Sequence, residues 1–218
     1  MQLLDGKVAS AAVLEEIATQ TKTWVEKGHR PPHLAAILVG EDGPSQTYVN
    51  SKVRTCQELG FGSTLRRFNA DIPESQLLAE IASINQNPDI DGLIVQLPLP
   101  EHIIETIRPE KDVDGFHPKN LGRMAQNQPA FISATPFGIL KLLDHYQIPT
   151  TGLHCVVLGR SPIVGQPMSI LMARNAEPGN CTVTICHSRT QNLKEMAASA
   201  DLLIVAMGRP RFVNADMV

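Results

Sequence analysis

The chain has 218 residues, of which 43% are hydrophobic and 19% charged, and its formal net charge is −3. This composition is typical of a globular protein of one large or two modest domains, and the charge gives no electrostatic support for nucleic acid or an anionic membrane as a partner. No apolar run approaches the roughly 20 residues that span a bilayer, and no secretory signal is visible at the N-terminus. We therefore expect a cytoplasmic protein with no membrane partner.

The first two thirds of the sequence alternate between helical and strand-like patterns. The predicted elements, in chain order, are a helix at 5–28, a strand at 34–39, a helix at 45–59, a strand at 63–68, a helix at about 73–85 and a strand at 92–97. This order predicts a parallel sheet with helices on both faces. Residues 101–134 are less regular, and a helix then runs to about Tyr146, with Thr135 as its N-cap and Pro136 at its first helical position.

A second α/β unit follows, with strands predicted at 154–158, 181–186 and 201–206 and helices between them. Three strands of this kind make half of a doubly wound domain. The predicted fold is therefore a two-domain α/β protein. Residues 1–145 form a three-layer catalytic domain with a parallel sheet, and residues 146–218 form a Rossmann-like NAD(P)-binding domain that is incomplete at the C-terminus.

Four cysteines, Cys56, Cys155, Cys181 and Cys186, lack the spacing of a metal-ligand motif. Three of them lie in or beside strand-like runs. We therefore expect buried free thiols in a reducing compartment, and no metal site.

Tyr48 and Lys52 are the first candidates for chemistry. They lie four residues apart in the second predicted helix and so share one helical face, which Ser45 nearly joins. A phenol, an ammonium and a hydroxyl near the end of a buried strand can carry out proton chemistry. Taken alone, the pattern favours an ordinary helix face with a half-buried tyrosine and a solvated lysine, because such pairs arise easily by chance.

The turn after the strand at 154–158 is a candidate pyrophosphate site. Gly159 and Gly165 punctuate this turn between a strand and a helix, although they do not form the common G-x-G-x-x-G pattern, and a purely structural turn remains the alternative. NAD-binding domains usually place an acidic residue after the second strand, where this chain has Ser188 and Arg189. A hydroxyl and a guanidinium suit a 2′-phosphate, to which Arg160 could also reach, and this favours NADP over NAD. Arg189 could instead be an unpaired surface arginine.

Five motifs in this order resemble one known family. They are Tyr48-Val-Asn-Ser-Lys52, Gln96-Leu-Pro-Leu-Pro100, Lys111-Asp-Val-Asp-Gly115, Thr135-Pro-Phe-Gly138 and the segment from Gly159 to Pro167. Together they resemble the methylenetetrahydrofolate dehydrogenase/cyclohydrolase family, commonly called FolD, over essentially the whole chain. The resemblance implies an NADP-dependent oxidation of 5,10-methylenetetrahydrofolate to the methenyl cation and its hydrolysis to 10-formyltetrahydrofolate, in one-carbon metabolism and purine biosynthesis.

The resemblance also implies roles for particular residues. Lys52 would be the central catalytic group, Tyr48 would stack on the folate rings, Gln96 would lie near Lys52, and Asp114 would hold the pterin. The like charge of the methenyl cation would favour a neutral Lys52 that could activate water. Asp114 could instead cap the turn at Gly115, and Gln96 could satisfy buried backbone at a strand end. The implied substrate-binding residues also include Leu97 and Pro98, and the implied cofactor-binding residues are Gly159, Arg160, Ser161, Gly165 and Ser188, to which the argument above adds Arg189.

The resemblance implies a homodimer, for which the apolar strand at 181–186 is a candidate interface. The chain ends before the last part of the family's cofactor domain, so we expect either a fragment or a truncated form, with little dehydrogenase activity. Two alternatives are open. A short-chain dehydrogenase would carry Tyr-x-x-x-Lys after the cofactor strands, whereas here the pair lies about a hundred residues before Gly159. A non-catalytic folate- or nucleotide-binding fragment would bind ligands without turnover.

Overall fold

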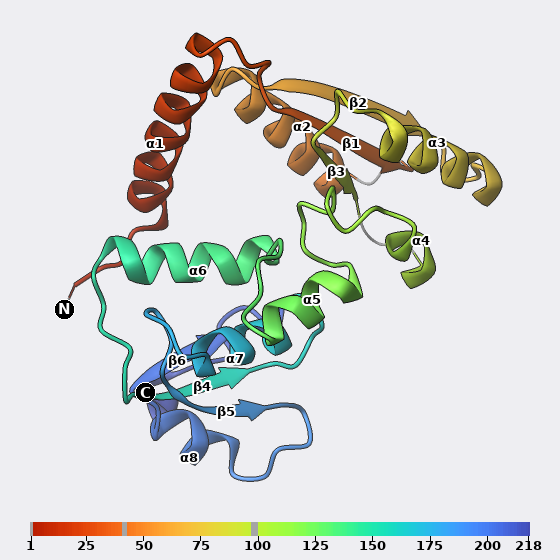
Figure 1. The fold of residues 1–218 in the computed structure, drawn as a ribbon. Helices are drawn as coiled ribbons and strands as arrows, with labels where there is room; N and C mark the ends of the chain where they lie inside the picture. The colour runs from red at the N-terminus through yellow and green to blue at the C-terminus, as the bar shows by residue number, and fades with distance from the viewer. Residues whose placement is uncertain (1, 41–42, 97–99) are drawn as a thin grey trace. The chain divides into compact units, whose positions relative to one another are not determined.

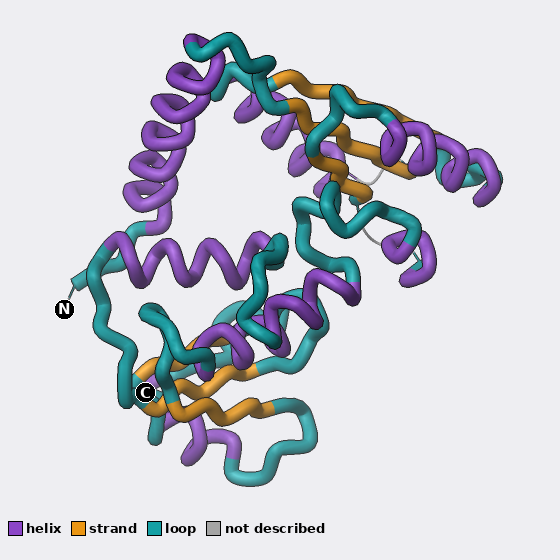
Figure 2. The backbone as a smooth tube through the Cα atoms, viewed as in Figure 1, coloured by secondary structure: helices purple, strands orange, loops and turns teal. Residues whose placement is uncertain are grey.

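The structure is a computed structural model that describes residues 2–40, 43–96 and 100–218. Its contacts divide the chain into two compact units, one of Asp5–Asn120 and the other of Leu121–Val218 together with the described residues 2–4. Figures 1 and 2 show that strands and helices alternate along the chain in both units. The predicted functional boundary between residues 145 and 146 stays a prediction, because compactness alone does not assign a folate or a cofactor role to either unit.

The first unit contains one parallel sheet of three described strands in the order β2-β1-β3. Its elements are α1 (Gly6–Glu26), β1 (His33–Val39), α2 (Gly43–Glu58), β2 (Gly62–Phe68), α3 (Glu74–Gln86), β3 (Gly92–Val95) and α4 (Glu101–Glu105), and α5 (Pro118–Ala125) begins at its end. All six strands and helices predicted up to residue 97 are present, with ends that differ by a few residues. The prediction of a parallel sheet is confirmed.

Alternate residues of β1 pack on opposite faces of this sheet, as the two-residue repeat of a strand requires. Ala35 and Ile37 pack with Ile81 of α3 on one face, whereas Ala36 and Leu38 pack with Val49 of α2 on the other. These side chains are almost completely inaccessible to solvent. Because both faces of β1 are buried, its sequence is apolar without interruption from Leu34 to Val39.

The second unit repeats this arrangement with strands in the order β5-β4-β6. Its elements are α6 (Ala134–His145), β4 (His154–Leu158), α7 (Gly165–Ala173), β5 (Thr182–Cys186), α8 (Leu193–Ala198), β6 (Leu202–Val205) and the 3-10 turn η1 (Ala215–Met217). Cys155 and Val157 pack with Met168 of α7 on one face of β4, and Val156 and Leu158 pack with α8 and η1 on the other.

Two details of the helices differ from the sequence prediction. The helix α6 begins at Ala134 with Ser133 at the N-cap, so Thr135 is not the cap and Pro136 is the third helical residue. Proline is still tolerated there because the first N–H groups of a helix have no partner within it. The short helices α4 and α5 lie in the segment that was predicted to be irregular.

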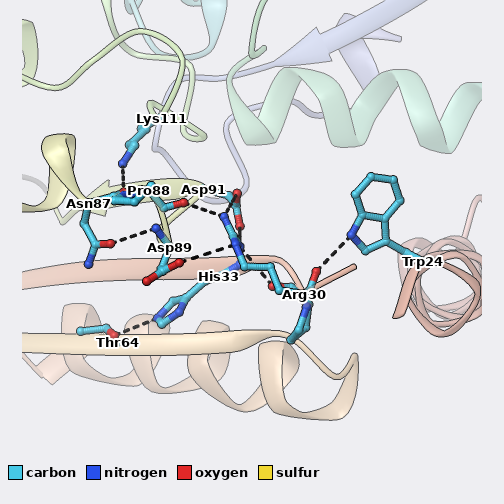
Figure 3. A network of polar contacts seen from close by, with 10 residues as sticks. Trp24, Arg30, His33, Thr64, Asn87, Pro88, Asp89, Asp91 and Lys111 are labelled. Atoms are coloured by element: carbon cyan, nitrogen blue, oxygen red, sulfur yellow. Dashed lines mark hydrogen bonds and ion pairs between the residues drawn. The ribbon is translucent and has the colours of Figure 1, made fainter. Parts of the chain in front are cut away.

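A set of hydrogen bonds that we call the amino-end clasp fastens the start of each sheet. In the first unit, the backbone N–H of His33 donates to Oδ2 of Asp91 at 2.8 Å, and the N–H of Asp91 donates to the carbonyl of His33 at 2.9 Å. Nε2 of His33 lies 2.8 Å from Oγ1 of Thr64 on β2 (Figure 3). Arg30 holds the same carboxylate of Asp91 through two bonds of 2.7 and 2.8 Å.

Among the described residues, the second unit has the same clasp without the arginine contacts. The N–H of His154 donates to Oδ2 of Asp201 at 2.8 Å, and the N–H of Asp201 donates to the carbonyl of His154 at 3.0 Å. Nε2 of His154 lies 2.9 Å from Oγ1 of Thr184 on β5. In both units, a carboxylate of the same unit thus accepts the first N–H of the central strand.

The four cysteines are free and buried, as predicted. Burial raises the pKa of Cys155 to about 12, and burial also raises the pKa of Cys56, Cys181 and Cys186. Within the described parts of the chain, no helix is long and apolar enough to cross a membrane.

Candidate active site

The helix α2 positions Tyr48 and Lys52 beside the first sheet. Its inner face is fixed by Val49, which is fully buried in the core, and by the buried Cys56 two turns later. Tyr48 precedes Val49 by one residue, and Lys52 follows it by three, so both lie at the margin of the packed face. The packing of α2 therefore determines where these two polar side chains lie.

Lys52 lies between an aromatic ring and a carboxylate. Its Nζ is 3.2 Å from Oδ1 of Asp114, and it is 4.2 Å from the centroid of the Tyr48 ring. The side chains of Lys52 and Asp114 are only 18% and 14% exposed, whereas Tyr48 is 48% exposed. An ammonium at this distance from a ring makes a cation–π contact, which adds to the charge-assisted hydrogen bond. Three of the predicted catalytic residues are thus brought together.

Burial dominates the electrostatics of Asp114. Loss of solvent raises the pKa of its carboxyl group, and the charge and hydrogen bond of Lys52 oppose this rise. The nearby Asp112 raises the pKa of Asp114 further. An ion pair removed from water in this way gains little net stability, because desolvation offsets the attraction between the charges. The arrangement is better suited to chemistry than to stabilising the fold.

Gln96 follows the last residue of β3 at the carboxyl edge of the sheet. Its backbone N–H donates to the carbonyl of Ile37 at 2.9 Å, and its side chain is half-buried. Ser45, which shares part of the face of α2, is buried. Leu97 and Pro98, which were predicted to bind substrate, lie outside the described residues.

The turn between β4 and α7 has no room for side chains at its two glycines. Gly159 has a φ of +125°, and a Cβ there would collide with the carbonyl oxygen of Ala206. A Cβ on Gly165 would collide with the carbonyl oxygen of Gly159. Oγ of Ser161 accepts hydrogen bonds from the N–H groups of Val164 and Gly165, at 3.2 and 3.4 Å. Packing of the backbone therefore requires glycine at both positions, and the turn leads into the N-terminus of α7, which is where strand–turn–helix units of nucleotide-binding domains hold a pyrophosphate.

A second loop lies beside this turn. The N–H of Gly159 donates to the carbonyl of Cys186 at 2.8 Å, so the ends of β4 and β5 are directly joined. Ser188 and Arg189 form the turn after β5, and both are exposed, as is Arg160. The turn is shaped by His187, whose Nδ1 accepts from the backbone N–H of Arg189 at 3.2 Å. The described parts of the chain contain no group of three or more His, Cys, Asp or Glu side chains that could hold a metal ion.

Comparison with protein families assigns both units. Residues 4–114 match the catalytic domain of the tetrahydrofolate dehydrogenase/cyclohydrolase family, and residues 133–218 match the NAD(P)-binding domain of the same family. The chain belongs to the FolD family. Membership over the whole length removes the short-chain dehydrogenase alternative, and it confirms the two-domain α/β fold that the sequence predicted.

Similar FolD proteins agree with this assignment. The chain is 58% identical to the bifunctional protein FolD of Cytophaga hutchinsonii and 55% identical to that of Porphyromonas gingivalis, matching all of this chain and 77% and 75% of those proteins. Among solved structures, the FolD enzyme of Campylobacter jejuni is 41% identical with a TM-score of 0.94, and the match covers all of this chain and 78% of that one. The Trypanosoma brucei enzyme, solved with NADP and an inhibitor, is 28% identical with a TM-score of 0.87, over 94% of this chain and 71% of that one.

Sequence reasoning missed two buried polar residues beside Asp114. Asp112 and Asn120 are 1% and 2% exposed and are hydrogen-bonded to each other at 2.9 Å. The only signal for Asp112 was a second carboxylate in the motif Lys111-Asp-Val-Asp-Gly115, and Asn120 had no signal because it belongs to a helix that was not predicted.

Proposed function

We propose that this FolD chain oxidises 5,10-methylenetetrahydrofolate with NADP and hydrolyses the methenyl product to 10-formyltetrahydrofolate. The observation that carries the proposal is the placement of Lys52, with its Nζ 3.2 Å from the carboxylate of Asp114 and 4.2 Å from the centre of the Tyr48 ring. Membership of the family supplies the substrate class and the two reactions.

Each residue has a role that its chemistry supports. Tyr48 is about half exposed and offers a flat face for the folate rings. Asp114 can accept paired hydrogen bonds from adjacent N–H donors of the pterin. Gln96, at the end of β3, lies at the same edge of the sheet and would orient Lys52 or the substrate. Lys52, whose Nζ lies close to Asp114 and to the Tyr48 ring, would contact the attacking water and move its proton.

The second unit would hold NADP, which would supply the hydride acceptor for the oxidation. Gly159 and Gly165 would let the turn pack tightly against its own backbone at the start of α7, where the pyrophosphate would bind, and Ser161 would keep the turn in shape through the N–H groups that it binds. Ser188, Arg189 and Arg160 would bind the 2′-phosphate, because a guanidinium pairs well with a doubly charged phosphate.

The first test of the function is hydrolysis of 5,10-methenyltetrahydrofolate, followed by the loss of its absorbance band. We expect the wild-type chain to hydrolyse the compound, Lys52→Met to lose this activity, and Lys22→Met to keep it, since Lys22 is a solvent-exposed residue of α1. Hydrolysis by the Lys52 variant at the wild-type rate would contradict the role of Lys52. Binding of tetrahydrofolate without any turnover by the wild-type chain would favour a non-catalytic binding role.

We also propose a cytoplasmic homodimer with no nucleic acid or membrane partner. The strand β5 is at the edge of its sheet, and Ile185 on this strand is 40% exposed, which supports pairing through this edge. Light scattering coupled to gel filtration should give twice the mass of the chain, and Ile185→Lys should give the mass of one chain. A wild-type protein that elutes as a monomer at micromolar concentration would contradict the dimer.

A further inference from the structure

The segment that carries Asp114 contains a second carboxylate, on Asp112, which is almost completely buried. Oδ2 of Asp112 accepts hydrogen bonds from the backbone N–H of His117 at 2.8 Å and from Nδ2 of Asn120 at 2.9 Å. Its Oδ1 accepts from the N–H of Phe116 at 3.3 Å. Removing a carboxylate from water costs free energy unless several donors replace the lost water, and three donors do so here.

These bonds close a tight loop around Asp114. The side chain of Asp112 bonds to residues four and five positions ahead of it, and Asp114 lies in the middle of the segment between them. The backbone carbonyl of Asp112 also accepts from the N–H of Gly115 at 3.1 Å, and Gly115 has a φ of +68° that favours glycine. The loop therefore has little freedom to move the carboxylate of Asp114 away from Lys52.

The closed loop is anchored at two further places. The amide of Asn120 donates to the carbonyl of Pro109 at 2.9 Å as well as to Asp112, so it joins the approach to the loop to its exit. On the other side, Nζ of Lys111 donates to the carbonyl of Ile84 at 2.8 Å and to that of Asn87 at 2.6 Å, both at the end of α3. The contact with Asn87 is drawn in Figure 3.

The loop is also attached to the sheet itself. The N–H of Leu93 on β3 donates to the carbonyl of Lys111 at 2.6 Å, and Asp112 forms an isolated parallel bridge with Leu93. The side chain of Val113 occupies the space beside Gly92, where an added Cβ would lie 2.6 Å from Cγ1 of the valine. The contact between Val113 and Gly92 therefore fixes how closely the loop lies against β3, one residue before Asp114.

We propose that Asp112 and Asn120 are positioning residues that hold the carboxylate of Asp114 against Lys52 in the folate site. This inference rests on the proposed function, in which Asp114 binds the pterin. The negative charge of Asp112 also acts on its neighbour directly, since it raises the pKa of Asp114. Burial is the larger cause of that raised pKa, so the pair acts mainly on the place of the group that contacts the substrate.

The test uses calorimetric binding of tetrahydrofolate and of NADP to the full chain. Asp112→Asn keeps the size of the side chain but turns one acceptor into a donor that faces other donors, and Asn120→Ala removes the link to Pro109. Each should raise the Kd for tetrahydrofolate about ten-fold or more, because a hydrogen bond to a charged group is lost, and should leave the Kd for NADP unchanged. The matched control Asp71→Asn, in an exposed turn of the same unit, should change neither.

A double-mutant cycle separates positioning from general damage. In an Asp114→Asn background, neither variant should weaken tetrahydrofolate binding further, because the group that they position is already changed. Full additivity in this background, an unchanged Kd in the single variants, an equal loss of NADP binding, or failure of both variants to fold would overturn the inference. A wild-type chain that does not bind tetrahydrofolate would instead refute the proposed function, and the inference with it.

Discussion

Asp114 is the residue whose protonation should govern folate binding. Burial raises the pKa of this carboxyl group above its ordinary value, so the group loses its charge at a higher pH than an exposed aspartate would. Below that pKa the ion pair with Lys52 is lost, and so is one of the two acceptors that the pterin requires. We therefore predict that the affinity for tetrahydrofolate falls as the pH drops through the raised pKa of Asp114.

The measurement is the Kd for tetrahydrofolate as a function of pH. Asp114→Asn should bind tetrahydrofolate weakly, and its affinity should not fall further in acid. Asp216→Asn, which changes an exposed carboxylate paired with Lys194, should keep the pH dependence of the wild type. If the affinity of Asp114→Asn still falls in acid as that of the wild type does, another group controls the pH dependence of binding.

The second prediction at this scale concerns the glycines of the cofactor turn. Gly165→Ala should weaken NADP binding strongly and destabilise the second unit by about 1–3 kcal/mol, because the new methyl group would collide with the carbonyl of Gly159. The matched control is Gly138→Ala in α6, where an added Cβ meets nothing within 4 Å. That change should stabilise the helix by about 0.5–1 kcal/mol.

Both quantities come from denaturant unfolding and NADP titration of the two variants. Wild-type NADP affinity in Gly165→Ala would mean that the turn can relax, and the assignment of the pyrophosphate to this turn would then lose its main support.

Among the elements, the clasps at the starts of β1 and β4 explain how two unrelated stretches of sequence form the same sheet edge. In each, one carboxylate accepts the first N–H of the central strand and thereby fixes the register of the third strand. The arginine contacts in the first clasp lower the pKa of Asp91, with the hydrogen bond from Arg30 as the largest cause.

This difference predicts unequal effects of removing the two carboxylates. Asp91→Ala should lower the free energy of unfolding more than Asp201→Ala, because the Arg30 bonds are lost along with the backbone bond. A lowered pKa stabilises the folded state above the pKa of the unfolded chain, and this contribution disappears as the pH falls through the pKa of the folded state. The gap between wild type and Asp91→Ala, measured by urea unfolding, should therefore shrink in acid. A gap that is constant down to the pH of acid unfolding would contradict the contribution of the ion pair.

The elements themselves were largely predictable because each long apolar run has a clear period. Continuous runs such as 34–39 and 154–158 are typical of buried parallel strands, and the structure has strands at both places. The helices α4 and α5 were not predictable in the same way, since each is too short to show a helical stripe. The start of α6 was misplaced because Ser133 and Thr135 are both residue types that cap helices, and Thr135 directly precedes Pro136.

At the scale of the whole molecule, each unit has its own core. Ile81 is completely buried in the first unit, and Met168 is completely buried in the second. We predict that Ile81→Ala costs about 2–5 kcal/mol and accelerates amide hydrogen exchange in residues 5–120, while NADP binding by the second unit persists. Met168→Ala should show the reverse pattern. Equal acceleration of exchange in both units by either variant would show that they unfold as one.

The site was predictable only as far as side chains repeat along one helix or match a known motif. Tyr48 and Lys52 follow from the helical period, but nothing in the sequence places Asp114, 62 residues after Lys52, within hydrogen-bonding distance of it. That contact depends on the loop closed by Asp112, whose partners come from a turn and from the unpredicted helix α5. A contact between residues so far apart in the sequence depends on how the chain packs. The family resemblance predicted that Asp114 belongs to the folate site, whereas local sequence patterns did not.

The buried thiols make it possible to measure local unfolding of this protein by the rate at which they are labelled. A thiol with a raised pKa that is buried from solvent reacts with a disulfide reagent only when the structure around it unfolds locally. The labelling rate therefore reports the frequency of local unfolding. One of these thiols, that of Cys56, lies in the first unit, and the other three lie in the second. Tetrahydrofolate should therefore slow the labelling of Cys56, and NADP should slow the labelling of Cys155, Cys181 and Cys186, without any dye or tag being added to the chain.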